Sequence, residues 1–320
     1  MSSIPRSVRA VTCVVALMCV VGCDRAIAPA PSPPPPKPST VVPDSTIVVA
    51  VGDIVCGSAT PPAFACQHAA TAQLTSTLAP DAVIALGDLQ YEDASLADFT
   101  TFYQPTWGVH KSITLPVAGN HEYDTPKAAG YFDYFNGVQV DSGPAGHRQR
   151  GYYTARLRNW RVIVLNSNCR AIGGCQAGSA QEQWLRVTLE ALPSGCVMAV
   201  MHHPRFSSAT NGSDTTVTAL WQALYDHGVE LVLAGHVHAY ERLAPQTASG
   251  VADPRGPRLF IVGTGGKEAH GLGRVGPNSD QQIGGTFGVL RLVLRESSYA
   301  WTFVPVPGGT GTDSGTASCS

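Results

Sequence analysis

The chain of 320 residues is 44% hydrophobic and 14% charged, with a formal net charge of −2. This length suffices for one large domain or two small ones. Because no block of like charge occurs, the composition argues against nucleic-acid binding through a basic face. The 33 glycines and 24 prolines favour many ordered loops around a sheet-rich core.

The first 22 residues have the pattern of a secretory signal peptide. Arg6 and Arg9 precede an apolar run over 10–21 that is too short to span a bilayer comfortably. The run ends in Val20-Val21-Gly22-Cys23, which resembles a bacterial lipoprotein lipobox. This resemblance implies cleavage before Cys23 and lipidation of its thiol. The alternative is an ordinary signal peptide cut within 26–30.

A proline-rich segment follows the cleavage site. Residues 28–43 carry no core residues and predict a semi-rigid, extended tether that would hold a folded domain off a surface. We therefore expect an exported protein, periplasmic or at the cell surface, whose membrane contact is the lipid anchor. The predicted parts are the anchor cysteine and tether over 23–45, a folded domain over 46–307 and a C-terminal tail over 308–320.

Six of the nine cysteines remain after Cys13 and Cys19 leave with the signal peptide and Cys23 is assigned to the anchor. An even number in an exported chain predicts three disulfides, for which 15 pairings are possible. No Cys-x-x-Cys pair occurs, which argues against a zinc site. We favour the local pairs and a third that attaches the tail: Cys56 with Cys66, Cys169 with Cys175, and Cys196 with Cys319.

Strands and helices alternate along the domain. Apolar runs predict strands at 45–53, 82–88, 113–118, 160–165, 197–201 and 229–234, and helical spacing predicts helices at 65–78, 179–192 and 215–227. Ser179 and Glu182 form a capping box for the second helix. Residues 151–157 are a hairpin partner for 160–165, and 259–262, 287–294 and 299–304 close the chain as strands. The alternation predicts an α/β fold, and the hairpins predict mixed sheets.

Five of the predicted strands end in residues that bind metal ions. His236 and His238 lie two apart after Gly235, so both can face one pocket from an extended segment. One such strand end is typical of an ordinary turn, whereas five together indicate a metal site where strand ends meet. In chain order the residues are Asp53; Asp88 with Tyr91; Asn120 with His121 and Glu122; His202 with His203; and His236 with His238.

These strand ends resemble, in order, spacing and context, the five motifs of the calcineurin-like metallophosphoesterases. Tyr91 makes the chain similar to the bacterial purple acid phosphatase-like branch. The resemblance runs from about residue 47 to 304 and implies a sandwich of two mixed β-sheets flanked by helices. The motifs are Gly52-Asp53, Gly87-Asp88-Leu89-Gln90-Tyr91, Gly119-Asn120-His121-Glu122, Val200-Met201-His202 and Gly235-His236-Val237-His238.

The resemblance also implies two metal ions about 3.5–4 Å apart, bridged by a carboxylate. Many calcineurin-like enzymes have a histidine where this chain has Val55, and Tyr91 replaces that ligand. A phenolate favours trivalent iron, so we expect Fe(III) paired with zinc, manganese or Fe(II), with an all-divalent pair as the alternative. The implied ligands are Asp88 as bridge, Asp53, Tyr91 and His238 for the first ion, and Asn120, His202 and His236 for the second.

The implied activity is that of a metal-dependent phosphoric ester hydrolase, acid phosphatase-like, acting on small phosphate monoesters. Two cations lower the pKa of a bound water, and the resulting hydroxide attacks phosphorus in line with the leaving oxygen. His121 is the candidate for orienting phosphate and protonating the leaving group. Glu122 would fix the tautomer of His121 or raise its basicity; the alternative is an acid at a helix N-terminus.

The remaining candidates lie around the fourth motif. On an extended segment His203 would point away from His202, which fits a supporting catalytic role at the substrate rim or an ordinary solvated side chain. Asn120, His121, Arg205 and Asn211 are the predicted substrate contacts, although the loop at 207–213 lacks the further histidines of plant-like members. We assign no role to the histidines outside the motifs: His68, His110, His147, His227 and His270.

Two alternative functions stay open at this point. A phosphodiesterase or nucleotidase could use the same fold and motifs, because the rim of the pocket decides which ester is cut. A non-catalytic, metal-bearing surface lipoprotein that binds a partner belongs to a different class.

Overall fold

The computed structural model describes residues 44–57, 66–210 and 212–319, all within one compact unit. The predicted signal peptide, the lipidated Cys23 and the tether up to residue 43 lie outside these ranges, as does Asn211. Within the described ranges, no helix has the length and apolar character needed to cross a bilayer.

The first sheet has six strands and mixed direction. β1, β2 and β3 run parallel to one another, whereas β13, β14 and β15 pair antiparallel with their neighbours. In spatial order the strands are β15 (Asp313–Ser318), β14 (Ser298–Pro305), β13 (Gly288–Leu294), β1 (Thr46–Val51), β2 (Ala82–Ala85) and β3 (Thr114–Pro116).

The second sheet has seven strands, and its centre is parallel. β7, β8, β9 and β11 run in one direction, while β6, β10 and β12 are antiparallel to their neighbours. The order is β12 (Ser279–Ile283), β10 (Tyr240–Leu243), β11 (Arg258–Val262), β9 (Leu231–Ala234), β8 (Val197–Val200), β7 (Trp160–Val164) and β6 (Tyr153–Leu157). β4 (Ser142–Gly143) and β5 (Gly146–His147) form a separate small hairpin.

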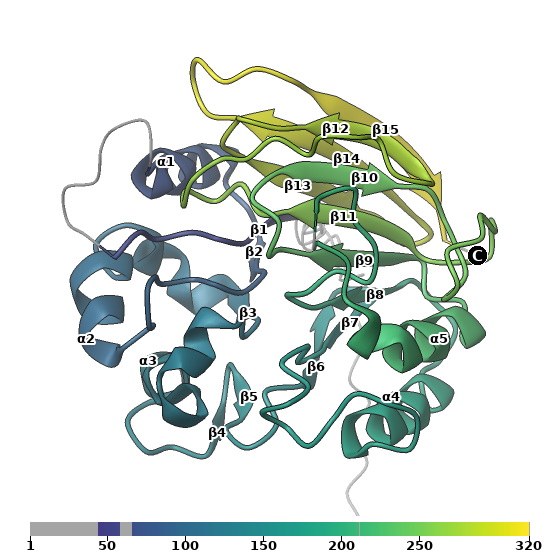
Figure 1. The fold of residues 1–320 in the computed structure, drawn as a ribbon, viewed down its shortest axis with the longest axis horizontal. Helices are drawn as coiled ribbons and strands as arrows, with labels where there is room; N and C mark the ends of the chain where they lie inside the picture. Colours follow the sequence, from purple (N-terminus) through teal and green to yellow (C-terminus); the bar gives the residue numbers. More distant parts are fainter. Residues whose placement is uncertain (1–43, 58–65, 211, 320) are drawn as a thin grey trace, which may run out of the picture. The chain divides into compact units, whose positions relative to one another are not determined.

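Alternate side chains of β8 enter the two hydrophobic cores on the opposite faces of the second sheet. Met198 and Val200 enter a core shared with the first sheet, whereas Val197 and Ala199 enter a second core with helices, as expected for side chains that alternate across a strand. The second core is completed by α4 (Ala180–Glu190) and α5 (Thr218–Asp226), which lie together beside β7, β8 and β9 (Figure 1).

The other helices, apart from the short one directly before α5, lie on the side of the first sheet. α1 (His68–Leu78) contacts β13, and the 3-10 helix η2 (Trp107–Ile113) contacts β2. The remaining short helices are α2 (Leu96–Asp98), η1 (Phe99–Tyr103), η3 (His121–Asp124), η4 (Pro126–Ala128), α3 (Ala129–Asn136) and η5 (Thr215–Val217). Helices outside two mixed sheets confirm the predicted fold class.

The structure also contains five strands that the sequence analysis did not predict: β4 and β5 of the small hairpin, and β10, β12 and β15 of the two large sheets. β15 lies within the region expected to be a tail, so that region forms the edge of the first sheet. The three disulfides join the pairs favoured from the sequence. Cys196–Cys319 connects the residue before β8 to the residue after β15 and thereby ties the two sheets together.

A buried ion pair reinforces this closure. The carboxylate of Asp313 accepts hydrogen bonds from Tyr240 Oη at 2.6 Å, Arg242 Nε at 2.8 Å and Trp301 Nε1 at 3.0 Å. Burial acts to raise the pKa of Asp313, but its hydrogen bonds with Arg242 and Tyr240 outweigh burial and leave the pKa below its ordinary value. The ionised carboxylate therefore stabilises the folded chain.

We expect Asp313→Asn to lower the free energy of unfolding at neutral pH by about 2–3 kcal/mol, because charge-assisted hydrogen bonds are lost. Because the folded-state pKa of Asp313 is depressed, its stabilisation is fully present above the unfolded-state pKa of about 4 and is lost as the pH falls from there through the lower folded-state pKa. Denaturant titrations at several pH values should show a smaller acid-induced loss in Asp313→Asn. The control is Asp280→Asn, an exposed partner of Arg242, with an expected cost below about 1 kcal/mol. Equal effects of the two substitutions would contradict this role.

Candidate metal centre

The predicted ligands converge where the carboxyl ends of parallel strands from both sheets meet. Asp53 and Asp88 follow β1 and β2 of the first sheet, and His202 and His236 follow β8 and β9 of the second. The backbone N–H of His236 donates to Asp53 Oδ2 at 2.8 Å, which links the two strand ends directly.

One cluster of donor atoms surrounds the hydroxyl of Tyr91. Tyr91 Oη lies 3.0 Å from Asp53 Oδ1, 3.1 Å from Asp88 Oδ2 and 3.1 Å from His238 Nε2. His238 Nε2 is also 3.3 Å from Asp53 Oδ1. These are the four residues that the resemblance assigns to the first ion.

A second cluster surrounds the imidazole of His202. His202 Nε2 lies 3.1 Å from Asn120 Oδ1 and 3.3 Å from Asp88 Oδ2, and the ring centroids of His202 and His236 are 5.1 Å apart. The same Asp88 oxygen faces both clusters. Asp88 is therefore placed where a bridging carboxylate between two ions would be.

The donor set fits metal ions on three grounds. Asp53 and Asp88 are 0% and 2% exposed, and neither has a lysine or arginine partner among the described residues. Two buried carboxylates without a basic partner require another source of positive charge. Two ligand atoms bound to one ion at about 2.1 Å and at right angles lie about 3 Å apart, close to the observed spacings. The donors are carboxylate, phenol, amide and imidazole, which suit iron, zinc and manganese.

Hydrogen bonds outside the two clusters orient the ligands. His202 Nδ1 lies 2.8 Å from the carbonyl oxygen of Leu86. An N–H at Nδ1 that donates to this carbonyl leaves the lone pair of Nε2 directed at Asp88 and Asn120. The backbone N–H of His121 donates to Asp88 Oδ1 at 2.9 Å, which holds the second carboxylate oxygen of the bridge.

Three ligands adopt a backbone conformation that non-glycine residues rarely use. The φ angles of Asp53, Asp88 and His236 are 60°, 49° and 70°. Aspartate and histidine are among the residues that tolerate this left-handed region best. The conformation turns each side chain into the site directly after its strand.

Protonation of the ligands depends strongly on the buried charge. Burial, followed by the charges of Asp53 and Asp88, raises the pKa of Tyr91 well above its ordinary value, and a bound cation would act in the opposite direction. Burial acts to lower the pKa of His202, but the Asp88 carboxylate outweighs it and raises the pKa to about 9. Protons and metal ions therefore compete for this site.

His121 lies at the accessible side of the centre. Its Nε2 is 4.0 Å from Asp88 Oδ2, and its ring centroid is 4.4 Å from that of Tyr91. Its Nδ1 lies 2.5 Å from the carbonyl oxygen of Glu92 and 3.2 Å from Asp124 Oδ2. These two acceptors fix an N–H at Nδ1 and leave Nε2 facing the ligands.

Glu122 does not contact the His121 ring, the first of its two predicted roles, and lies instead in the first turn of η3, as the alternative predicted. Its carboxylate is fully buried and accepts backbone N–H bonds from Asp88, Leu89 and Gly119 at 2.9, 2.8 and 2.6 Å. Glu92 and Asp124, rather than Glu122, contact the His121 ring. Glu122 therefore holds the loops after β2 and β3 together, because their N–H groups lack backbone partners there.

His203 also points in an unexpected direction. The chain bends at His202 and His203 instead of staying extended, so the ring of His203 lies 4.5 Å from that of His236 by centroid. Its Nδ1 is 2.8 Å from Ser167 Oγ. Burial and the charges of His202 and His236 lower the pKa of His203 to about 2, so the imidazole is neutral.

The two other predicted substrate contacts are not seen at the centre. The guanidinium of Arg205 donates to the carbonyl of Ala248 at 3.1 Å and lies 4.3 Å from the ring centroid of Phe206. It braces the loop after β10, and its role in binding substrate stays a prediction. Asn211 is outside the described residues.

Two further residues lie near the centre, and one of them, His270, was given no role from the sequence. The ring of His270 stacks on His238, with centroids 4.9 Å apart and planes 19° apart. Glu241 is fully buried and accepts hydrogen bonds from Ser207, Ser208 and Ser279. Glu241 lies three residues after His238, so its carboxylate connects the segment that carries His236 and His238 to the loop at 207–213. His270 carries no local signal, because its contact with His238 is long-range.

Two pockets adjoin the centre. One, of about 490 Å³, is lined by residues that include Asn120, Asp124 and His203. The other, of about 420 Å³, is lined by His236, His238 and His270 together with 271–273. The centre is therefore accessible from two directions.

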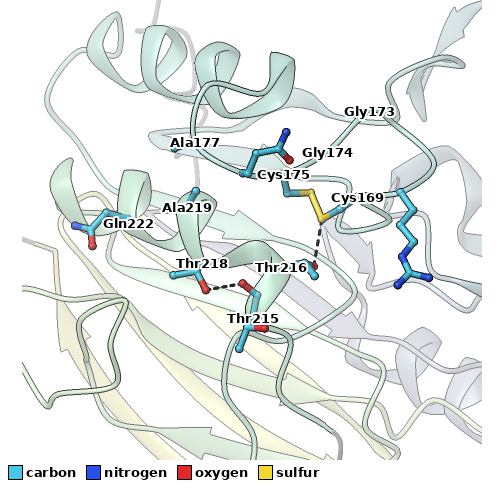
Figure 2. Close-up of a pocket in the computed structure, with 12 residues that line it drawn as sticks. Cys169, Gly173, Gly174, Cys175, Ala177, Thr215, Thr216, Thr218, Ala219 and Gln222 are labelled. Atoms are coloured by element: carbon cyan, nitrogen blue, oxygen red, sulfur yellow. Dashed lines mark hydrogen bonds between the residues drawn. A yellow bond between two sulfur atoms is a disulfide. The ribbon is translucent and has the colours of Figure 1, made fainter.

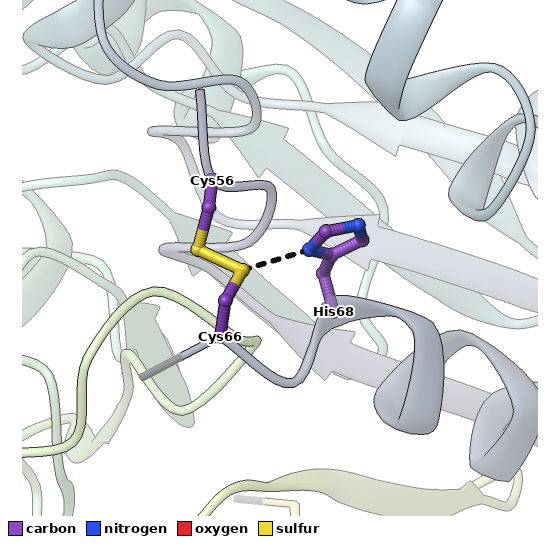
Figure 3. A group of neighbouring side chains, drawn as sticks. All are labelled: Cys56, Cys66 and His68. Carbon is purple, nitrogen blue, oxygen red and sulfur yellow. Dashed lines mark hydrogen bonds between the residues drawn. A yellow bond between two sulfur atoms is a disulfide. The ribbon is translucent and has the colours of Figure 1, made fainter. Parts of the chain in front are cut away.

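A separate group of possible ligands can be set aside. Cys56, Cys66 and His68 lie close together (Figure 3), with His68 Nδ1 2.9 Å from Cys66 Sγ. The two sulfur atoms are joined in a disulfide, so no thiolate is available to bind a metal.

Comparisons with known proteins identify a family and several relatives. Residues 46–240 match the family model of calcineurin-like phosphoesterases. A probable purple acid phosphatase 20 of Arabidopsis thaliana is 28% identical over 248 residues, which cover 69% of this chain and 54% of that protein. The Fe(3+)-Zn(2+) purple acid phosphatase 12 of the same plant is 26% identical over 211 residues, covering 58% and 44%.

Solved structures give the same picture of the fold. A purple acid phosphatase from yellow lupin seeds matches with a TM-score of 0.71 and 19% identity, covering 86% of this chain and 54% of that one. The chain thus spans about half the length of the curated relatives it matches.

We expect Gly119→Ala to reduce metal affinity by at least about tenfold, since even indirect disturbance of a ligand costs this much. A Cβ at Gly119 would lie 2.2 Å from both the backbone nitrogen and Oδ1 of Asp88, so the bridge must move. Metal content after desalting, measured by elemental analysis, checks this. Gly271→Ala is the control, because a Cβ there meets nothing within 4 Å. Wild-type metal content in Gly119→Ala would show that Asp88 does not hold the ions.

Proposed function

The chain belongs to the calcineurin-like phosphoesterase family, and on this premise we propose that it is a phosphatase that hydrolyses phosphate monoesters at a pair of metal ions. The observation that carries the proposal is the position of Asp88 Oδ2, which faces Tyr91 on one side and His202 on the other. A single oxygen shared by two donor clusters is what a binuclear site requires.

Bound to these clusters, the two cations would activate a water molecule and neutralise charge on the phosphate. The protein's own groups supply the rest. The amide of Asn120 and the neutral imidazole of His203 line the pocket that would receive the phosphate. His121, with Nδ1 held by Glu92 and Nε2 directed at the centre, would deliver a proton to the leaving oxygen.

The proposed metals are Fe(III) and a divalent ion, either zinc, manganese or Fe(II). Tyr91 supports iron because a phenolate is a hard, anionic donor. The name of the similar Arabidopsis protein, an Fe(3+)-Zn(2+) phosphatase, is consistent with this pairing. A pair of divalent ions is the alternative.

We place this activity outside the cytoplasm. The three disulfides of the described chain support an oxidising compartment. The signal-peptide pattern and the lipobox support export and attachment through Cys23.

A phosphodiesterase is the second candidate, and the second pocket favours it. A diester has two substituents on phosphorus, and the pocket beside His236, His238 and His270 could receive the second one. A binding lipoprotein without activity is the third reading, and retention of His121 beside the ligands speaks against it.

We expect the pure protein to cleave 4-nitrophenyl phosphate with kcat/KM at least about tenfold above that for the bis-ester. His121→Ala should lower kcat by about 100-fold or more, the usual contribution of a general acid. The control is His227→Ala at the end of α5, where Nδ1 contacts the Ala223 carbonyl; less than a twofold change is expected. Preference for the diester would favour the second candidate, and unchanged activity in His121→Ala would defeat the catalytic assignment.

We expect the iron-loaded protein to show a visible absorption band from charge transfer between tyrosinate and iron. Tyr91→Phe should abolish the band, because the ring stays packed while the donor oxygen is lost. The matched control is Tyr103→Phe, a buried tyrosine whose hydroxyl has no partner among the described residues. A colourless protein that retains two metal ions per chain would contradict the assignment of Fe(III) and favour a pair of divalent ions.

A further inference from the structure

A groove leads away from the metal centre along the Cys169–Cys175 hairpin. The pocket beside Asn120 and His203, of about 490 Å³, and a larger pocket of about 720 Å³ share three lining residues: Cys169, Arg170 and Thr216. The two pockets therefore lie next to each other, and Arg170 lines both of them, including the one at the proposed phosphate site; we call the two adjacent pockets the groove. A bare phosphate ion occupies far less space than this groove offers.

Figure 2 shows the two walls of the outer part of the groove. The Cys169–Cys175 disulfide and the glycines at 173 and 174 form one wall, and residues 215–222 form the other. The hydroxyl of Thr216 lies 3.5 Å from Cys169 Sγ and connects the walls at the inner end. Carbon atoms form most of the lining surface, and its polar groups are the threonine hydroxyls, the amides of Gln176 and Gln222 and the guanidinium of Arg170.

The charge of the groove is concentrated in one side chain. Of the described residues that line the outer pocket, Arg170 alone is charged. Arg170 is exposed and has no hydrogen-bond or ion-pair partner in the described part of the chain. Its guanidinium is therefore free to bind an anion.

The acidic residues of the inner pocket do not neutralise Arg170. Asp214 accepts hydrogen bonds from the backbone N–H and hydroxyl of Thr216 at 2.8 and 2.7 Å. Asp124 Oδ2 lies 3.2 Å from Nδ1 of His121. Both carboxylates have local partners, whereas the cation has none.

We infer that this groove holds the leaving group of the substrate and that Arg170 binds a second anionic group on it. The substrate class is therefore a phosphate ester that carries another phosphate or a carboxylate away from the phosphorus being attacked. This inference rests on the proposed phosphatase function and deepens it. The Cys169–Cys175 disulfide, with a sequence separation of 6, closes the short loop that carries Arg170 beside the groove.

The test compares a hexose monophosphate with the corresponding hexose bisphosphate. A third ester, 4-nitrophenyl phosphate, has a small leaving group without a phosphate or carboxylate. Wild-type protein should show a KM for the bisphosphate about tenfold below that for the monophosphate. Arg170→Ala should remove this difference by raising KM for the bisphosphate, with less than a twofold change for the other two esters. Arg170→Lys should recover part of it, since lysine keeps the charge but not the bidentate geometry.

Two further measurements separate binding by Arg170 from a general effect of charge or folding. The exposed Arg295 lies in the turn between β13 and β14, and Arg295→Ala should leave all three KM values unchanged. The double variant Cys169→Ser, Cys175→Ser should lose discrimination while still cleaving 4-nitrophenyl phosphate. The advantage of the bisphosphate should also shrink at about 1 M salt, where the screening length is about 3 Å.

Equal KM values for the two hexose esters in active wild-type protein would overturn the inference and leave the proposed function standing. Equal loss of both esters in Arg170→Ala would also overturn it, because the arginine would then act on the common phosphate or on folding. A protein that cleaves none of the three esters would overturn the proposed function and, with it, this inference.

Discussion

The burial of two carboxylates at the meeting point of two sheets is the constraint on which the rest of the structure depends. Asp53 and Asp88 follow neighbouring parallel strands, so their charges lie close together and away from solvent. No lysine or arginine among the described residues pairs with them, and histidines from the opposite sheet lie beside them instead. The sandwich brings these strand ends together, and two buried carboxylates at such a short distance require cations to neutralise their charge.

Two further buried carboxylates, those of Glu122 and Glu241, are not among the proposed metal ligands and instead accept hydrogen bonds from loop residues. Glu122 binds three N–H groups of the loops that carry Asp88 and Asn120, and Glu241 binds the loop at 207–213. Each carboxylate therefore accepts hydrogen bonds from loop groups that would otherwise be buried without partners. Ligand positions in this centre are thus set by short loops that are locked from outside the ligand shell.

How much of this could be predicted from the sequence depended on the range of the interactions. The seven proposed ligands were found because each follows an apolar strand, and parallel strand ends meet at one edge. The strands β10, β12 and β15 were missed because sequences such as Ser279–Ile283 and Asp313–Ser318 are polar and lack a clear alternation. The direction of His203, the partners of Glu122 and the stacking of His270 depend on bends and long-range contacts that no local pattern encodes.

The left-handed backbone at Asp53, Asp88 and His236 limits which residues can occupy these positions. Each is a proposed metal ligand, and for such a role aspartate, glutamate, histidine, asparagine and cysteine are the main choices. Each must also accept a positive φ, which asparagine, aspartate and histidine do most readily after glycine. Only the residues present, and the closest alternatives among these three types, satisfy both requirements. Glycine would relax the chain but remove the donor, and glutamate would keep the donor but strain the chain, so these strand ends have almost no neutral substitutions.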